Sequence, residues 1–181
     1  PKSFPVLATT ATATLRVQED IIQQVGTDLI PIRGQLLRSN IRLFVVTVQS
    51  EDEKFFWLAE YLPKLKKTGI VYTGTQANTD IFSNWLQFLK FNSAAYSGRL
   101  DAESRMRVET DFIQNKYDCV VSTNALGMGI DKPDIRFIIH TQIPQSPIHY
   151  YQEIGRAGRD GQEAFAILLY NPNEDAELPR A

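Results

Sequence analysis

Cysteine is almost absent from this sequence of 181 residues. The single cysteine, Cys119, lies within the apolar run YDCVVST. A disulfide framework and a zinc site built from several cysteines are therefore both excluded. A reducing compartment is the default setting for such a chain. We expect a cytoplasmic location, associated with the nucleoid if the source is bacterial.

Long apolar runs and a bias of charge are missing as well. No run approaches the roughly 18 to 20 apolar residues that span a membrane, and the opening residues PKSFPVLATT do not have the layout of a signal peptide. The 19 Lys and Arg nearly balance the 21 Asp and Glu, which gives a net charge of −2. The sequence predicts a soluble protein with no membrane partner. Any binding of nucleic acid must come from a local group of residues.

What the sequence has is the composition of a globular domain, with 43% hydrophobic and 22% charged residues. From Ile41 onward, continuous apolar segments alternate with amphipathic ones. We predict strands at residues 41–50, 69–73, 92–96, 118–123, 134–140 and 163–170, with helices at 51–69, 75–91 and 100–115 between the first four. This alternation is typical of a mostly parallel sheet covered by helices on both faces. Further toward the N-terminus, we predict a strand at residues 4–7 and a helix at residues 15–26.

An arginine motif near the C-terminus is the most informative stretch. Residues 149–161 read HYYQEIGRAGRDG, which spaces Gln152, Arg156 and Arg159 four and three residues apart. On a helix these three side chains would share one face. The glycines beside the arginines each cost a helix roughly 0.5 to 1 kcal/mol relative to Ala, but they allow close approach to the backbone. We interpret the motif as an anion site for phosphate; the alternative is a solvated basic helix end with a glycine stop.

Polar turns follow the second, third and fourth predicted strands of the main domain. They are Gly74-Thr75-Gln76, Ser97-Gly98-Arg99 and Thr123-Asn124, with Gly127-Met128-Gly129-Ile130-Asp131 just beyond the last. Ligands of parallel sheets collect at the carboxyl ends of the strands, and these backbone N–H groups, hydroxyls and guanidinium suit phosphodiester oxygens. Taken singly, each has a simpler alternative: a plain turn at Ser97, a helix cap at Thr75, and loop glycines of positive φ at 127 and 129.

Together these segments resemble the motifs of superfamily 2 helicases, in the order and spacing of that family. Q-x-x-G-R-x-G-R resembles the sixth motif, GIVYTGTQ the fourth, VVSTNALGMGIDKPDIRFIIH the fifth and TTATAT the third. YYQEIGRAGRDG and AYSGRL resemble the RecQ DNA helicase versions, although His-Ala-Gly is more usual there in place of Ser97-Gly98-Arg99. The resemblance covers nearly the whole chain. It implies a three-layer α/β/α RecA-like fold and the second motor domain of an ATP-dependent 3′-5′ DNA helicase.

The resemblance also implies roles for individual residues. Five would contact the backbone of the tracking DNA strand: Thr75, Ser97, Gly98, Arg99 and Thr123. Five would face the nucleotide: Gly129, Asp131, Gln152, Arg156 and Arg159. Within that set, Asp131 would accept from the ribose hydroxyls, and Arg159 would act as an arginine finger with Arg156 and Gln152 in support. The alternative is that Arg159 pairs with a neighbouring acid, such as Asp160 or Glu163, and only ties down a loop.

The resemblance further implies a domain plan. Residues 1–26 would be the end of the first motor domain, 27–40 a linker, 41–175 the second motor domain and 176–181 a tail. The chain begins inside an apolar segment and ends soon after a strand, so we expect it to be a piece of a longer protein.

A helicase motor also needs a phosphate-binding loop G-x-x-x-x-G-K-[ST] and an acidic pair for magnesium, and the sequence contains neither. No metal ligands are predicted. ATP and Mg²⁺ would be held mainly by the preceding motor domain, a partner in cis. The other expected partner is DNA, single-stranded or at a duplex junction, and the chain alone should be inactive.

Two other functions remain open at this stage. One is an RNA helicase or duplex translocase, because the arginine motif is shared; the context of Tyr150 and Tyr151 and the segment GMGIDKP favour DNA. The other is a non-catalytic nucleic-acid-binding relic, against which the intact Asp131, Arg156 and Arg159 argue.

Overall fold

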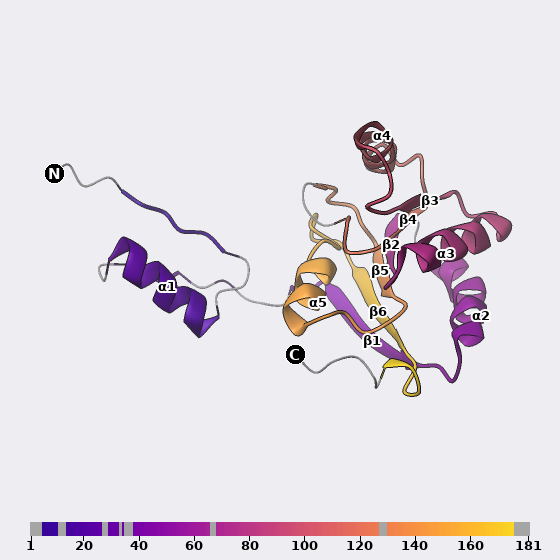
Figure 1. Cartoon of the computed structure of the whole chain (residues 1–181), viewed down its shortest axis with the longest axis horizontal. Helices are drawn as coiled ribbons and strands as arrows, with labels where there is room; N and C mark the ends of the chain where they lie inside the picture. Colours follow the sequence, from indigo (N-terminus) through magenta and orange to yellow (C-terminus); the bar gives the residue numbers. More distant parts are fainter. Residues whose placement is uncertain are drawn as a thin grey trace. The chain divides into compact units, whose positions relative to one another are not determined.

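The computed structural model describes residues 5–10, 14–26, 29–32, 34, 38–65, 68–126 and 130–175. The chain consists of two compact units, residues 1–38 and residues 39–181, each taken here by itself (Figure 1). The second unit contains the sheet and every residue to which a role was assigned.

In the described residues of the first unit there is one helix, α1 (Leu15–Val25), as predicted. It begins where the Thr14 hydroxyl accepts a hydrogen bond from the Val17 N–H at 3.3 Å, because a side-chain oxygen at this position satisfies an N–H that the helix leaves free. It ends at Gly26, whose φ of 116° suits glycine. Residues 5–7 have no regular structure, so the strand predicted at 4–7 is wrong over the part that is described. Residues 11–13, half of the threonine-rich stretch TTATAT at 9–14, lie outside the described residues.

The second unit is built on six parallel strands. They are β1 (Ile41–Thr47), β2 (Gly69–Tyr72), β3 (Ser93–Tyr96), β4 (Cys119–Ser122), β5 (Phe137–His140) and β6 (Ala164–Tyr170). Their order across the sheet is β1-β6-β5-β2-β4-β3, and every neighbouring pair is parallel. These pairings confirm the predicted parallel sheet. Strands β2, β4 and β5 are buried along their whole length, in agreement with their continuous apolar sequences.

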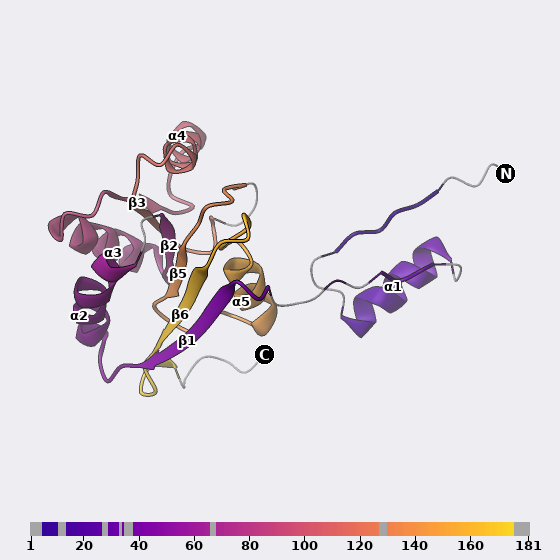
Figure 2. The same cartoon turned by 180° about the vertical axis from the view of Figure 1, so that it is seen from behind.

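Helices cover both faces of this sheet, which confirms the predicted three layers (Figures 1 and 2). They are α2 (Glu51–Tyr61), α3 (Gln76–Phe88), α4 (Ala102–Ile113) and α5 (Pro147–Ile154). On one face, α2 and α3 pack Leu58 and Leu86 into the same apolar cluster as Val71 of β2. On the other face, α4 packs Phe112 into a cluster with Ile70 of β2. Alternate residues of one strand therefore serve two cores.

The helix α2 is shorter than predicted. It ends at Tyr61 and continues as one turn of 3₁₀-helix, η1 (Leu62–Lys64), instead of running on to residue 69. Pro63 explains the difference, because proline has no N–H to donate to the Ala59 carbonyl and its ring disturbs the preceding turn.

The helices α2, α3, α4 and α5 each begin with a side-chain N-cap. The side-chain oxygen of the residue just before the helix accepts a hydrogen bond from the backbone N–H three residues later. The caps are Ser50 for α2, Thr75 for α3, Asp101 for α4 and Ser146 for α5. Each cap fixes the point at which the chain leaves a strand or loop and enters a helix.

Candidate functional site

The residues predicted to contact nucleic acid lie at the carboxyl ends of three neighbouring strands. β4 lies between β2 and β3 in the sheet, with Tyr72 and Tyr96 both in register with Ser122. Because the three strands are parallel, the turns that follow them emerge at the same edge. The structure therefore brings Thr75, the turn 97–99 and Thr123 together, although their roles stay predictions.

These residues differ in what they can offer a ligand. Thr75 is exposed, and its hydroxyl accepts from the Asn78 N–H at 3.1 Å, so it is the helix cap that the simpler alternative proposed. Ser97 is buried at 7% exposure, and its hydroxyl accepts from the Arg99 N–H at 3.4 Å within a turn. Thr123 is 9% exposed and accepts from the Ala125 N–H at 3.3 Å. Gly98 and Arg99 are exposed. Thr75 and Arg99 are thus the most accessible polar side chains of the group.

The arginine motif is only partly helical. The helix α5 ends at Ile154, and residues 155–160 form turns, as in the bond from the Arg156 N–H to the Glu153 carbonyl at 3.1 Å. Gln152 is exposed on α5, whereas both arginines lie beyond its end. The prediction that the three side chains share a helical face is wrong, because Gly155 terminates the helix and Gly158 takes a positive φ of 58° that favours glycine.

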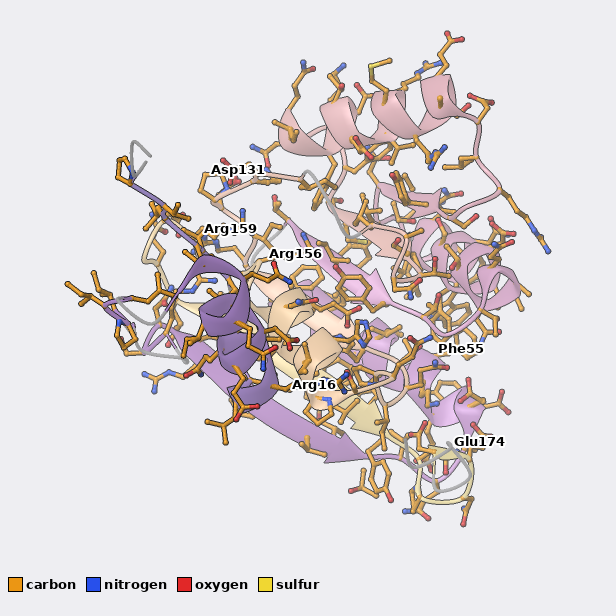
Figure 3. The ribbon with its side chains drawn as sticks, turned by 60° about the vertical axis from the view of Figure 1, so that its left-hand side comes forward. Arg16, Phe55, Asp131, Arg156, Arg159 and Glu174 are labelled. Atoms are coloured by element: carbon orange, nitrogen blue, oxygen red, sulfur yellow. The ribbon has the colours of Figure 1, made fainter. Side chains whose placement is uncertain are left out.

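Two of the residues predicted to face a nucleotide contact each other. Arg159 donates from Nη1 to Asp131 Oδ1 at 2.9 Å, and both side chains are accessible, at 39% and 88% exposure. Figure 3 labels both residues of the pair and also Arg156. The alternative partners of Arg159 are occupied elsewhere: Asp160 bonds Arg136 and Glu163 bonds Arg42. The ion pair that the alternative expected for Arg159 is present, but its partner is Asp131 and not Asp160 or Glu163. Gly129 lies outside the described residues.

A buried arginine that the sequence analysis did not single out holds this pair in place. Arg136 bonds both carboxylate oxygens of Asp160 at 2.7 Å. Its other contacts are with backbone carbonyls of Pro133 at 3.2 Å, Asp134 at 3.0 Å and Glu163 at 3.2 Å. It thereby ties the segment after Asp131 to the segment after Arg159. A signal was available, because a charged residue directly before a buried apolar strand must find partners.

Asn40 is a second residue that was missed. It was predicted to belong to a linker, yet its Nδ2 donates to the carbonyls of Gly158 at 2.8 Å and Gln162 at 2.7 Å, on either side of Arg159. A Cβ built on Gly158 would lie 2.5 Å from the Asn40 amide nitrogen, so the contact is close-packed. Nothing in the local sequence pattern around Asn40 indicates this contact, since it joins residues far apart in the chain.

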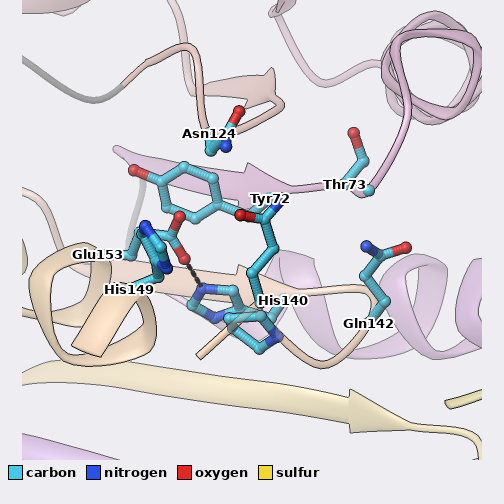
Figure 4. A pocket seen from close by; sticks show the side chains of 10 residues that line it. Tyr72, Thr73, Asn124, His140, Gln142, His149 and Glu153 are labelled. Atoms are coloured by element: carbon cyan, nitrogen blue, oxygen red, sulfur yellow. Dashed lines mark hydrogen bonds and ion pairs between the residues drawn. The ribbon is translucent and has the colours of Figure 1, made fainter. Parts of the chain in front are cut away.

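A small cavity of about 70 Å³ opens at the carboxyl ends of β2 and β5 (Figure 4). Two aromatic side chains in its lining are buried: Tyr72 stacks on His140 with ring centres 5.2 Å apart. His140 Nε2 bonds Glu153 Oε2 at 2.7 Å. Amide side chains of Asn124, Gln142 and Gln145 also line it. None of these six residues was assigned a role from the sequence.

Burial raises the pKa of Tyr72 well above its usual range, and the positive charge of the Arg156 guanidinium opposes this rise. Tyr72 therefore stays protonated at all ordinary pH values. In the described part of the chain, Arg156 and Arg159 offer two guanidinium groups, and Asp131 offers a carboxylate beside Arg159. The guanidinium groups can donate to a polyphosphate, and the carboxylate can accept from ribose hydroxyls.

Two further properties bear on the chemistry. The described residues contain no group of three His, Cys, Asp or Glu side chains that could hold a metal ion. Among the described residues, every helix is too short or too polar to span a lipid bilayer.

Comparison with known proteins gives the same motifs a wider context. The chain is 37% identical to a probable ATP-dependent DNA helicase RecS and 35% identical to an ATP-dependent DNA helicase RecQ, both of Bacillus subtilis; the matches cover 94% and 93% of the chain. It is also 38% identical over 93% of its length to a putative ATP-dependent RNA helicase R290 of Acanthamoeba polyphaga mimivirus. The chain spans only 35%, 28% and 31% of these relatives.

The fold itself recurs in a solved structure. A Saccharomyces cerevisiae Dbp5 variant bound to Gle1 and IP6 superposes with a TM-score of 0.80 over 93% of this chain and 44% of that one, at 21% identity. The sheet and helices of residues 39–181 thus have a RecA-like α/β/α fold. The profile described as helicase conserved C-terminal domain matches residues 53–161, from α2 through the cavity to Arg159. The chain, similar over nearly all its length to RecQ-type DNA helicases, therefore belongs to the helicase conserved C-terminal domain family.

Proposed function

We propose that this chain is the second motor domain of an ATP-dependent 3′-5′ DNA helicase of the RecQ type. The observation that carries the proposal is the contact between Asp131 and Arg159, two residues that come from separate motifs and meet at 2.9 Å. In a helicase C-terminal domain, these groups are chemically matched to the ribose and the phosphates of one nucleotide. The preceding motor domain would supply the phosphate-binding loop and the acidic pair for Mg²⁺.

Arg159 is the proposed arginine finger. Phosphoryl transfer spreads negative charge over several oxygens, and a planar guanidinium can bond two of them at once, which an ammonium cannot. The ion pair between Arg159 and Asp131 is exposed, and such pairs contribute only about 0 to 1 kcal/mol. A phosphate can therefore replace Asp131 as the partner of Arg159 at small cost, which frees Asp131 for the ribose. Arg156 supports phosphate binding, and Gln152 assists from α5.

The edge formed by the turns after β2, β3 and β4 is the proposed DNA contact. Arg99 supplies the charge, while Thr75, Gly98 and the backbone around Ser97 and Thr123 supply uncharged donors. Such groups recognise phosphates and not bases, so binding would be independent of sequence and would weaken with salt.

An RNA helicase is the second candidate. It is favoured by one observation, the 38% identity to a relative named as a putative RNA helicase. Strand displacement on matched DNA and RNA duplexes by the full-length protein would separate the two. Unwinding of the DNA substrate alone supports the first proposal, and unwinding of the RNA substrate alone replaces it.

The decisive variant for the nucleotide role is Arg159→Lys in the full-length protein. We expect ATP and DNA affinity to remain within a few-fold, while ATP turnover and unwinding fall together by about 10³-fold or more, because the stabilised charge develops in the transition state. Arg42→Lys is the matched control, since Arg42 is exposed and pairs with Glu163 at 3.2 Å. Near-normal turnover in folded Arg159→Lys would move the finger to Arg156 or remove it.

A further inference from the structure

An open apolar groove lies between helices α2 and α3, and none of its lining residues has been assigned a role. Its volume is about 450 Å³, and five of its seven lining side chains are apolar: Phe55, Phe56, Ile81, Trp85 and Phe88. Three of them are largely exposed, Phe56 at 68%, Ile81 at 52% and Phe88 at 71%. A contiguous exposed apolar surface of this kind is typical of a site that binds another molecule.

The two walls of the groove are joined by aromatic contacts. The Phe55 ring stacks on Phe82 with centres 4.4 Å apart and meets the edge of the Trp85 ring at 5.9 Å. Trp85 donates from Nε1 to the Phe55 carbonyl at 3.1 Å, and its ring stacks on Phe88 at 5.6 Å. These contacts hold α2 and α3 side by side, as Figures 1 and 2 show. The groove is therefore already formed in the free chain.

Two carboxylates border the apolar side chains. Asp52 lines the groove, one helical turn before Phe56. Asp80 lies one turn before Asn84, which also lines the groove. Both carboxylates are exposed, and within the described ranges neither has an ion-pair partner. This charge disfavours nucleic acid and anionic lipid, and it favours a partner that carries Lys or Arg beside its apolar side chains.

The walls and the size of the groove restrict the shape of that partner. Helices bond their own backbone N–H and C=O groups, so a partner cannot be held here by strand addition and must insert side chains, as a helix does in a groove. Seven lining residues are far fewer than the roughly 20 to 30 on each side of a stable interface between folded proteins. The groove therefore fits a short segment better than a second copy of the chain.

The groove and the arginine motif lie on opposite faces of the sheet. Phe55 packs against the apolar cluster that contains Val71, whereas Ala157, beside Arg156, belongs to the cluster with Ile70 on the other face. A segment bound in the groove would leave Arg156 and the other residues of the proposed nucleotide site uncovered.

We propose that the groove between α2 and α3 binds a short amphipathic helix of a partner protein. This helix inserts two or three apolar side chains beside Phe56 and Phe88 and places Lys or Arg next to Asp52 and Asp80. The inference goes beyond the proposed motor function and does not depend on it, because it uses no residue of the nucleotide or DNA sites.

The test is a titration of the full-length protein against a fluorescein-labelled synthetic helix, measured by fluorescence anisotropy. The peptide carries Leu at positions i, i+3, i+4 and i+7 and Lys on its remaining face. We expect saturable binding that weakens about threefold or more between low and high salt. A peptide with the same Leu positions and Glu in place of Lys should bind about tenfold more weakly or less. Equal binding of the two peptides would overturn the proposal.

Phe56→Ala and Phe88→Ala test the apolar part of the groove. Each should weaken binding of the lysine peptide by about tenfold or more, because each removes an exposed aromatic contact surface. Met106→Ala is the matched control, since Met106 is 63% exposed on α4, on the other face of the sheet. It should bind the peptide as wild type does. The proposal fails if Met106→Ala loses as much affinity, or if neither phenylalanine variant loses any.

A double variant, Asp52→Asn with Asp80→Asn, tests the charged part. Affinity for the lysine peptide should fall severalfold at low salt and little at high salt. Glu103→Gln is the control, because Glu103 is also an exposed carboxylate in the first turn of a helix, α4. Unchanged affinity and unchanged salt dependence in the double variant would overturn the assignment of a basic partner.

Other occupants of the groove give other results. If the peptide binds the 181-residue chain but not the full-length protein, another part of the same protein covers the groove and the proposal is overturned. If Phe56→Ala converts a dimer to a monomer in sedimentation, the occupant is a second copy and the proposal is again overturned. Arg159→Lys, which tests the motor function, should leave peptide binding unchanged, so either proposal can fail alone.

Discussion

At the scale of single residues, some side chains would carry the proposed chemistry, and others fix the backbone segments on which those side chains stand. Asp131 and Arg159 were expected near one ligand, and they meet directly. Arg136 and Asn40, which hold the segments around that pair, were not predicted. Charge type and motif spacing identify a residue that presents a group to a ligand. They do not identify a residue whose partners are backbone carbonyls from distant turns, because carbonyls are the same in every sequence.

We predict that Arg136→Lys destabilises the folded chain. The lysine ammonium can replace one of the contacts of the guanidinium. It cannot bond both carboxylate oxygens of Asp160 and three backbone carbonyls at the same time. Because Arg136 is buried, with 6% exposure, the free energy of unfolding should fall by about 1 to 3 kcal/mol. Urea denaturation measures this change. Arg42→Lys, an exposed pair, should change stability by less than about 1 kcal/mol, and equal losses in both variants would contradict the prediction.

We also predict an acid-dependent contribution from Asp160. Hydrogen bonds from Arg136 hold the pKa of Asp160 below its ordinary value of 3.8. The folded state thus favours the carboxylate more than the unfolded state does, so the stabilisation is present above about pH 4 and is lost as the pH falls further. Denaturation of wild type and Asp160→Asn at pH 7 and at pH 3 tests this. The difference in stability between the two proteins should shrink at pH 3, and a constant difference would be evidence against it.

At the scale of elements, the strands were predicted well and some ends of helices were not. Continuous runs of apolar residues indicate buried strands such as β2 and β4, so the sequence predicted both these strands and their parallel pairing. The end of α5 was not predicted from the sequence. The three- and four-residue spacing of Gln152, Arg156 and Arg159 is typical of a helix whether or not Gly155 ends it. The arginines consequently reach their positions through turns and the positive φ of Gly158.

Thr75 offers a way to separate a cap from a DNA contact. Thr75→Asp should keep α3 capped, because a carboxylate accepts from the Asn78 N–H as well as a hydroxyl does. The same change should weaken binding of single-stranded DNA, since it places a negative charge beside the phosphates. Thr75→Ala should lose about 1 kcal/mol of stability and much less DNA affinity. Denaturation together with fluorescence anisotropy at low salt measures both; unchanged DNA affinity in Thr75→Asp would exclude the turn from the DNA interface.

At the scale of the whole molecule, the chain would supply one side of the proposed nucleotide site. The guanidinium groups and Asp131 are in place, but no phosphate-binding loop of the required pattern occurs in the sequence. A missing motif can be read directly from the residues, whereas the contact between Asp131 and Arg159 is seen only in the structure.

We predict that the 181-residue chain by itself hydrolyses ATP at a negligible rate and binds nucleotide with millimolar or weaker affinity, on the order of 4 kcal/mol. Addition of single-stranded DNA should not change this, because DNA cannot supply the missing half of the site. A coupled ATPase assay and calorimetric titration would measure both quantities. Robust DNA-stimulated hydrolysis by the purified chain would contradict the half-site description.

The position of β1 has a consequence for how the chain acquires its fold. In the described sheet, β1 lies at an edge beside β6, pairing residue 41 with residue 164, and it exposes Leu43, Phe44 and Val45. During synthesis from the N-terminus, this apolar strand emerges long before its partner exists. Closing so long a loop costs entropy that is recovered only when the parallel pair forms. We therefore expect the other four strands to assemble first and the β1–β6 edge to form last, which leaves β1 open to misassociation throughout translation.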